Sequence, residues 1–189
     1  MPLQYVNRLE KTYYLHEGVT KTGKPRYYFS LKSEGKLLDN MPEGFEIYEN
    51  PSGQVYCRKV PKKIITDEEV ALVEQGMERF SKIEYYKIDV RQKTIRVFIT
   101  NQDTDRILEI ISSGSGLKEA RKLLMLAIDY SPYMEFVLTD DKARLFIVRR
   151  YCFKGAVDDW TNVGEPDRLD ELVKKYVRHL GEDSYYELF

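Results

Sequence analysis

Cysteine, histidine and tryptophan are scarce in this sequence of 189 residues, which has two Cys, two His and one Trp. Cys57 and Cys152 lie far apart, unlike the closely spaced sets that mark disulfide scaffolds. Neither His16 nor His179 has a Cys or a second His nearby in the sequence, so no zinc-binding motif is present. We therefore expect a reducing compartment and no cofactor.

Long apolar runs are also missing. The longest, Leu123–Ile128, is far shorter than the roughly 20 residues that a membrane-spanning helix needs. Residues 1–10 contain no basic cluster followed by an apolar stretch, so we expect no signal peptide. These features predict a soluble, cytoplasmic protein without a membrane partner.

Net charge is small, because 30 Lys and Arg side chains nearly balance 31 Asp and Glu, giving −1. This balance excludes strong attraction of the whole molecule to nucleic acid or to an acidic membrane. The distribution is uneven, since residues 1–63 hold 11 basic and 7 acidic side chains while the remainder is net acidic. Aromatic residues make up 13% of the chain, which is typical of a sequence that folds.

Tyrosine-rich, β-prone stretches dominate the first third of the chain. Residues 12–16 and 26–31 predict two strands joined by a polar loop. Residues 45–49 and 54–60 flank the sequence Asn-Pro-Ser-Gly, which suits a type I turn followed by a left-handed glycine. Residues 1–63 are thus expected to form a β-rich N-terminal part of two hairpins.

Residues 64–189 alternate between helical and strand patterns. Thr66 and Glu69 have the spacing of a capping box, and an amphipathic helix is predicted over residues 67–80. Alternating apolar residues then predict a hairpin over residues 86–99.

The second half of this region repeats the helix–hairpin order. An almost wholly apolar helix over residues 117–129 is expected at the centre of the core, and a hairpin follows over 134–152. The recurrence at an offset of 50 residues is consistent with duplication or with the general alternation of strands. A long loop and a final helix beginning near Pro166 complete the pattern.

The fold class predicted from these elements is α+β. Antiparallel sheet of about eight strands, built from hairpins, is expected to carry three main helices on one face. Residues 1–63 and 64–189 are the expected parts, either as two domains or as one continuous domain.

Residues 18–25 (GVTKTGKP) nearly match the phosphate-binding loop G-x-x-x-x-G-K-[ST]. Pro25 stands where that loop needs a hydroxyl to hold magnesium, and the following residues are β-prone rather than helical. The expectation for this stretch is therefore an ordinary hairpin loop.

Basic and aromatic side chains interleave between residues 21 and 36, and a second basic run follows at residues 58–63. Proteins that bind single-stranded nucleic acid combine such charges with aromatic rings on which bases stack. The same pattern also arises when the rings lie in the core and the lysines face solvent. The residues predicted to contact nucleic acid are Lys21, Lys24, Arg26, Tyr28, Lys32, Lys62 and Lys63.

Three carboxylates, Asp103, Asp105 and Glu109, lie close together after the predicted 86–99 hairpin. Such clusters hold magnesium in some hydrolases and nucleases. Acidic residues also favour the first turn of a helix, because they oppose its dipole. We therefore expect no metal site. If the protein does bind a metal ion, these three residues are the candidate ligands.

No assembled catalytic motif is found in the sequence. We therefore expect a non-catalytic binding or regulatory module that engages another macromolecule, with single-stranded nucleic acid as a partner suggested by the basic and aromatic N-terminal residues. The alternative is a metal-dependent hydrolase or nuclease that uses Asp103, Asp105 and Glu109. The sequence identifies neither a particular partner nor an oligomeric state.

Overall fold

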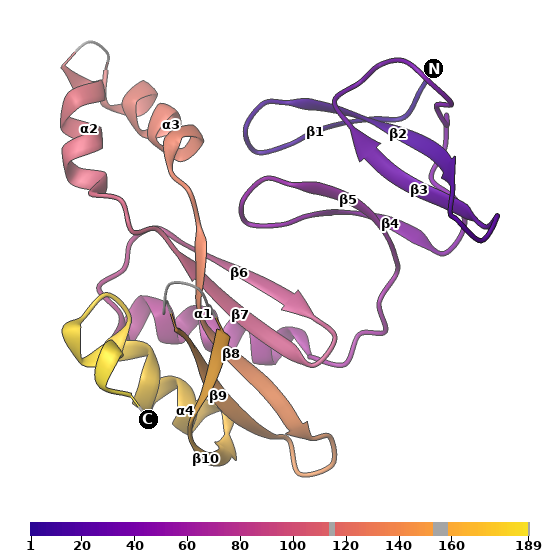
Figure 1. The fold of residues 1–189 in the computed structure, drawn as a ribbon. Coiled ribbons are helices and arrows are strands. Elements are labelled where there is room, and N and C mark those ends of the chain that lie inside the picture. Colours follow the sequence, from indigo (N-terminus) through magenta and orange to yellow (C-terminus); the bar gives the residue numbers. More distant parts are fainter. Residues whose placement is uncertain (114–115, 153–158, 189) are drawn as a thin grey trace. The chain divides into compact units, whose positions relative to one another are not determined.

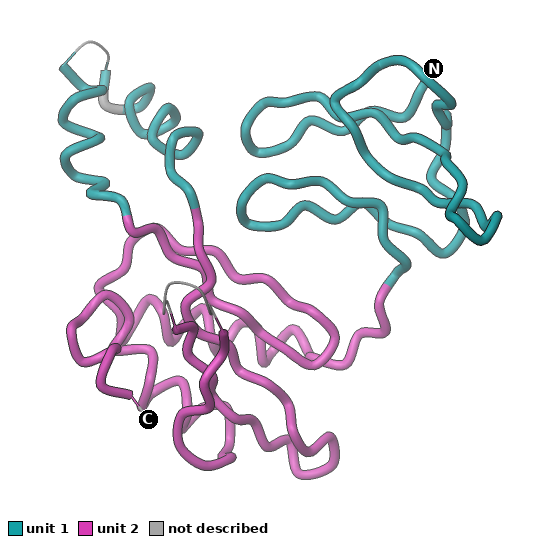
Figure 2. The backbone as a smooth tube through the Cα atoms, viewed as in Figure 1, with its two compact units in different colours: residues 1–60, 102–129 teal, residues 61–101, 130–189 magenta. Residues whose placement is uncertain are grey.

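The computed structural model describes residues 1–113, 116–152 and 159–188, which form ten strands and four α-helices (Figure 1). All strand pairings in these residues are antiparallel, which confirms the α+β class with antiparallel sheet. The expected count of about eight strands and three helices is too low. The chain divides into two compact units, residues 1–60 with 102–129 and residues 61–101 with 130–189 (Figure 2).

The first unit contains two small sheets. Strands β1 (Gln4–Val6), β2 (Thr12–Val19) and β3 (Pro25–Ser30) form one sheet, and the hairpin of β4 (Phe45–Glu49) and β5 (Val55–Lys59) forms the other. A shared core joins the two sheets and is centred on the buried side chains of Leu15, Phe29 and Val55.

The turns of both hairpins follow from their sequences. Gly53 donates its N–H to Asn50 O at 2.9 Å and has a φ of 80°, as expected for a turn that ends in a left-handed glycine. The loop between β2 and β3 is closed by hydrogen bonds between Thr20 and Lys24 and opens into a strand. The near match to a phosphate-binding loop is therefore a hairpin loop, as predicted.

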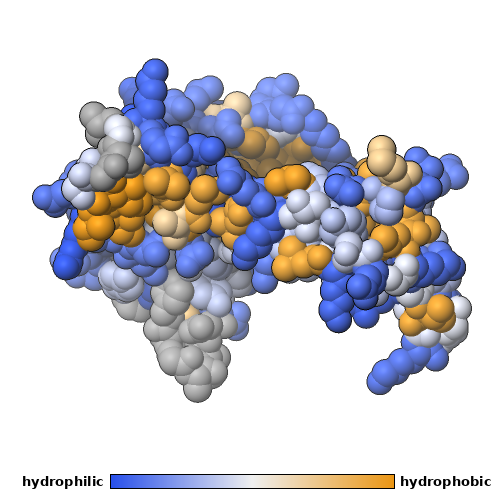
Figure 3. Space-filling view, turned by 90° about the horizontal axis from the view of Figure 1, so that it is seen from above, coloured by the Kyte–Doolittle hydropathy of each residue, from blue (hydrophilic) through white to orange (hydrophobic). Residues whose placement is uncertain are grey.

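Helices α2 (Thr104–Ser112) and α3 (Leu117–Ala127) complete the first unit. The expectation that residues 117–129 lie at the centre of the core is wrong. Among the side chains of α3 whose burial the structure describes, Ala120 and Leu124 are buried, whereas Leu123 is 40% exposed. Ile110 on α2 and Met125 on α3 are also exposed. Figure 3 shows apolar side chains gathered in a band over these helices.

A five-stranded sheet forms the second unit, in the order β10-β9-β8-β7-β6. Its strands are β6 (Tyr86–Arg91), β7 (Thr94–Ile99), β8 (Ser131–Asp140), β9 (Leu145–Cys152) and β10 (Asp159–Arg168). Helices α1 (Asp67–Phe80) and α4 (Leu169–Tyr176) cover one face, where alternate strand residues such as Val97, Phe136 and Val148 form the largest core of the protein.

The capping box predicted for α1 is present. Thr66 Oγ1 accepts a hydrogen bond from the Glu69 N–H, and Glu69 Oε2 accepts one from the Thr66 N–H. Glu69 also holds Arg144, which lies in the turn between β8 and β9, through contacts of 2.6–3.0 Å. One carboxylate therefore ties the start of α1 to the sheet.

Of the loop expected before the last helix, residues 159–168 form the strand β10, and residues 153–158 lie outside the described residues. Pro166 lies within an irregular part of that strand, between Val163 and Asp167, and α4 begins only at Leu169. The polar residues of β10 do not favour a strand by themselves, so pairing with β9 determines its conformation.

The C-terminal segment is anchored by Tyr185, which follows α4 and the 3₁₀ turn Val177–His179. The Tyr185 hydroxyl lies 2.5 Å from Tyr133 O and accepts a hydrogen bond from the Tyr151 N–H at 3.1 Å. Burial raises the pKa of this phenol well above its usual value of 10. A single hydroxyl thereby joins the segment to both β8 and β9.

No helix in the described parts of the chain is both long enough and apolar enough to cross a membrane.

Candidate nucleic-acid interface

The outer face of the β2–β3 hairpin, opposite the core of the first unit, carries several of the residues predicted to contact nucleic acid. His16 pairs across the strands with Tyr28, and Gly18 pairs with Arg26. Residues directly opposite each other in an antiparallel pair lie on the same face, and so do alternate residues along one strand. These four residues therefore share one face. Tyr27 points to the other face, where its ring meets Phe45 edge to face at 5.1 Å.

Tyr28 is held in place on this face but is not covered. Its ring stacks on His16, with 5.2 Å between the centroids and 11° between the planes, and Arg26 Cζ lies 5.7 Å from its centroid. Tyr28 is nevertheless 39% exposed. It is therefore an oriented aromatic ring that solvent can reach.

The basic side chains of this hairpin are exposed and form no ion pair with an acidic side chain among the described residues. Lys21 and Lys24 lie in the loop that leads into β3, and Arg26 follows two residues after Lys24. Lys32 lies just beyond the strand, where its carbonyl oxygen accepts a hydrogen bond from His16 Nε2 at 2.9 Å. This hairpin surface, defined by Lys21, Lys24, Arg26 and Tyr28, therefore carries unneutralised positive charge beside an exposed ring.

Lys62 and Lys63 belong to the second unit and are not part of the hairpin surface. Both are exposed, and Lys63 forms an ion pair with Asp67 at 2.5 Å in the first turn of α1. The residues predicted from sequence are thus divided between the two units.

The candidate metal ligands Asp103, Asp105 and Glu109 lie at the N-terminal cap of α2 and along that helix. Asp103 is the N-terminal cap of that helix, and its Oδ1 accepts a hydrogen bond from the Arg106 N–H at 3.0 Å. Asp105 and Glu109 are exposed on the helix. In the portion of the chain that the structure describes, no three His, Cys, Asp or Glu side chains are grouped so that they could hold a metal ion.

A second basic and aromatic surface, not foreseen from the sequence, lies on the face of the five-stranded sheet opposite α1 and α4. Arg96, Glu135 and Arg149 stand opposite one another on β7, β8 and β9. The ring centroid of Trp160, on β10, lies 4.8 Å from Arg96 Cζ and 5.8 Å from Arg149 Cζ. The signal in the sequence was weak, because it consisted of single charged residues such as Arg96 and Glu135 within mainly apolar strands.

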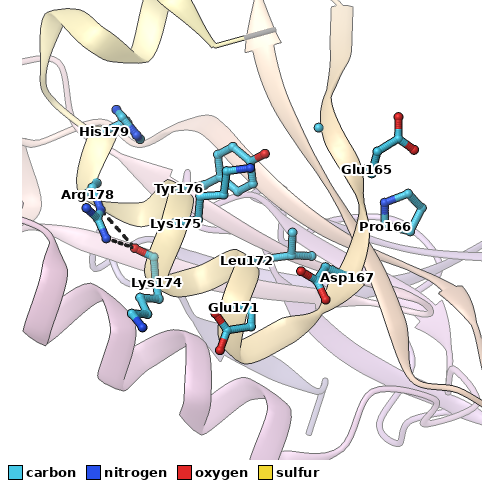
Figure 4. A pocket seen from close by; sticks show the side chains of 11 residues that line it. Glu165, Pro166, Asp167, Glu171, Leu172, Lys174, Lys175, Tyr176, Arg178 and His179 are labelled. Atoms are coloured by element: carbon cyan, nitrogen blue, oxygen red, sulfur yellow. Dashed lines mark hydrogen bonds between the residues drawn. The ribbon is translucent and has the colours of Figure 1, made fainter.

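A groove of about 670 Å³ lies between the end of β10 and α4 (Figure 4). Glu165 and Asp167 line it from the strand, while Lys174 and Arg178 line it from the helical side. Arg178 donates hydrogen bonds to Lys174 O at 2.8 and 3.1 Å. Because the lining contains both signs of charge, it offers a phosphate backbone less attraction than the hairpin surface does.

Comparison with known proteins gives one partial resemblance. The chain is 28% identical, over 127 residues, to DNA polymerase III subunit alpha from Aquifex aeolicus (strain VF5). The match covers 62% of this chain but 11% of that protein, so the chain spans a small part of the length of its relative. No family model and no solved structure matches the chain.

The extent of the match identifies elements that it must contain. A continuous segment covering 62% of the chain includes the central residues wherever it begins, and these contain β6, β7 and α2. The resemblance therefore takes in residues of both units, including the strand that carries Arg96.

Proposed function

We propose that this protein is a binding module for single-stranded nucleic acid, and that the hairpin surface of Lys21, Lys24, Arg26 and Tyr28 contacts the ligand. The supporting observation is the exposed, oriented ring of Tyr28 beside cations that have no acidic partner in the described structure. A base can stack on the ring while the phosphates meet the cations.

The chemistry of the surface favours single strands over duplexes. A duplex hides the faces of its bases, whereas a single strand can turn a base onto an aromatic side chain. Base stacking does not require a particular sequence, so we expect modest sequence preference.

DNA is the nucleic acid to test first. The matched relative is, by its name, a subunit of a DNA polymerase. Lys32, in the same unit as the hairpin surface, and Lys62 and Lys63, in the other unit, are further proposed contacts.

The proposal is tested by measuring the affinity for a labelled oligo-dT strand at several salt concentrations. Each phosphate contacted by a cation should contribute about −0.7 to the slope of log affinity against log salt. The double variant Lys24→Glu, Arg26→Glu should weaken binding and flatten that slope.

A matched control is Lys174→Glu, Arg178→Glu, which reverses two charges in the groove beside α4 and leaves the hairpin surface intact. The proposal fails if the wild type shows no binding that depends on salt, or if both double variants lose the same affinity. In the second case binding would follow the net charge of the protein and not this surface.

A further inference from the structure

The face of the five-stranded sheet opposite α1 and α4 carries a row of directly opposed residues. Asp89, Arg96, Glu135, Arg149 and Asn162 pair in that order across β6, β7, β8, β9 and β10. The neighbouring core-facing residues pack against the helices, so no helix of the same unit covers this row. Antiparallel sheets commonly keep one face available in this way.

Glu135 organises the centre of the row. Its side chain is 2% exposed, and each of its oxygens faces a different guanidinium group. Arg96 donates to Oε2 from Nε and Nη2 at 2.8 and 2.6 Å, and Arg149 Nη1 lies 3.1 Å from Oε1. The two hydrogen bonds from Arg96 to one oxygen restrict the orientation of its guanidinium group, and the ion pair holds Arg149 at the other oxygen.

Two guanidinium groups share the Glu135 carboxylate, and Asp89, the other carboxylate of the row, forms an ion pair with Arg91 at 2.7 Å. Counted with Arg91, the row therefore carries one positive charge in excess. Arg96 and Arg149 retain side-chain exposures of 21% and 32%. The contacts with Glu135 use Nε and Nη2 of Arg96 and Nη1 of Arg149, and each guanidinium group has further N–H donors. These groups can donate to an anion that approaches the face of the sheet.

Trp160 lies beside this charge. Its indole is half-buried, both guanidinium groups lie over its ring, and the Tyr151 ring meets it edge to face at 5.1 Å. An aromatic ring combined with cations has the chemistry that single-stranded nucleic acid binds, since bases stack on aromatic rings and phosphates pair with cations.

We propose that Arg96, Arg149 and Trp160 form a second binding surface for single-stranded DNA, separate from the hairpin surface. This inference takes its class of ligand from the proposed function but uses other residues in the other unit. Glu135 is a positioning residue here, because it orients both guanidinium groups and does not itself attract phosphate.

Trp160 allows this surface to be observed directly, because it is the one tryptophan in the sequence. Titration of the full chain with oligo-dT should produce saturable quenching of tryptophan fluorescence. Polyglutamate, a polyanion without bases, should not quench at the same charge concentration. Equal quenching by polyglutamate would overturn base stacking on Trp160.

Substitutions then test the residues. Trp160→Ala should lower the affinity for labelled oligo-dT about fivefold to a hundredfold, as for the loss of one stacked base. Arg149→Gln should weaken binding and reduce the magnitude of the salt slope by about 0.7. The control is Arg79→Gln, which removes an exposed charge from α1 on the opposite side of the sheet. If Arg149→Gln behaves like Arg79→Gln, the surface is not used.

The two proposals fail in different ways. If oligo-dT binds without quenching, and Lys24→Glu, Arg26→Glu abolishes binding, the hairpin surface stands and the sheet surface is overturned. If quenching persists with unchanged affinity in that double variant, the sheet surface stands and the assignment to the hairpin is wrong. If the wild type does not bind, both fall. A tenfold preference for oligo-U would replace DNA by RNA as the ligand of the sheet surface.

Discussion

Tyr28 is stacked on His16, and His16 is itself fixed by the carbonyl oxygen of Lys32. His16 is 4% exposed, whereas Tyr28 is 39% exposed, so the buried ring supports the accessible one. The support reduces the rotamer freedom that Tyr28 would lose on binding a base. A ring held in this way is better suited to stacking than a mobile one of equal exposure.

Replacing Tyr28 should separate stacking from charge. Tyr28→Ala should reduce the free energy of binding to oligo-dT by about 1–3 kcal/mol without changing the salt slope, because no charge is removed. Tyr28→Phe keeps the ring and should bind nearly as well as the wild type. Tyr56→Ala, which removes an exposed ring from β5, is the matched control. Fluorescence anisotropy with labelled oligo-dT measures all four proteins, and equal losses for Tyr28→Ala and Tyr56→Ala would contradict the stacking role.

The capping box of α1 should contribute measurably to stability. Thr66→Ala removes the acceptor for the Glu69 N–H and should lower the free energy of unfolding by about 1 kcal/mol. Thr66→Ser retains a hydroxyl and should lose much less. Urea denaturation followed by circular dichroism distinguishes the two variants. Identical midpoints would show that the hydroxyl of Thr66 does not contribute to stability.

Tyr185 should make stability depend on alkaline pH. Its folded-state pKa is raised by burial, so the unfolded protein loses this proton first as the pH rises above about 10. The contribution of Tyr185 to the free energy of unfolding should therefore be constant below that pH and fall above it, by up to about 1.4 kcal/mol per pH unit.

Tyr185→Phe provides the test of that dependence. The variant should lose about 1–3 kcal/mol at neutral pH, since the Tyr151 N–H and Tyr133 O lose their partner. It should also show a shallower decline above pH 10 than the wild type. Tyr56→Phe, at an exposed position, should change neither quantity. A decline as steep in Tyr185→Phe as in the wild type would assign the alkaline effect to other groups.

The metal-dependent alternative can be tested without an assay for activity. If Asp103, Asp105 and Glu109 bind magnesium or manganese, millimolar metal should raise the melting temperature, because the ion would bind the native state. Asp103→Asn with Asp105→Asn removes two charges while keeping a residue that caps helices well at position 103. We expect no metal-dependent shift in the wild type, and a shift that the double variant abolishes would favour the hydrolase.

Local signals in the sequence predicted the elements that form by local chemistry. The cap at Thr66 and the turn closed by Gly53 each depend on residues within a few positions of one another, and both are present. Strand β10 could not be predicted, because its polar residues become a strand only by pairing with β9. Helix α3 was expected in the core from its apolar composition, but composition alone does not say which neighbours a helix will find.

The candidate surfaces show the same division. The hairpin residues are close in sequence, so a pattern of alternating charges and rings was visible before the fold was known. Arg96, Glu135 and Arg149 come together only through the registers of two strand pairings, both of which contain irregularities. A shift of one residue in either register would turn a side chain to the opposite face. That dependence on tertiary structure explains why the sequence did not reveal the sheet surface.

The sequential strand order of the second unit has a consequence for synthesis on the ribosome. Each of β7, β8, β9 and β10 adds to the edge left by the strand before it, so the sheet can grow as the chain emerges. The step from β7 to β8 must wait until α2 and α3 have been made, which leaves the edge of β7 unpaired during that interval. The core between the sheet and its helices is completed last, when α4 and Tyr185 have been synthesised. Nascent chains that stall between β7 and β8 would therefore expose a strand edge and apolar core residues, and we expect this window to be the one in which the protein most needs a chaperone.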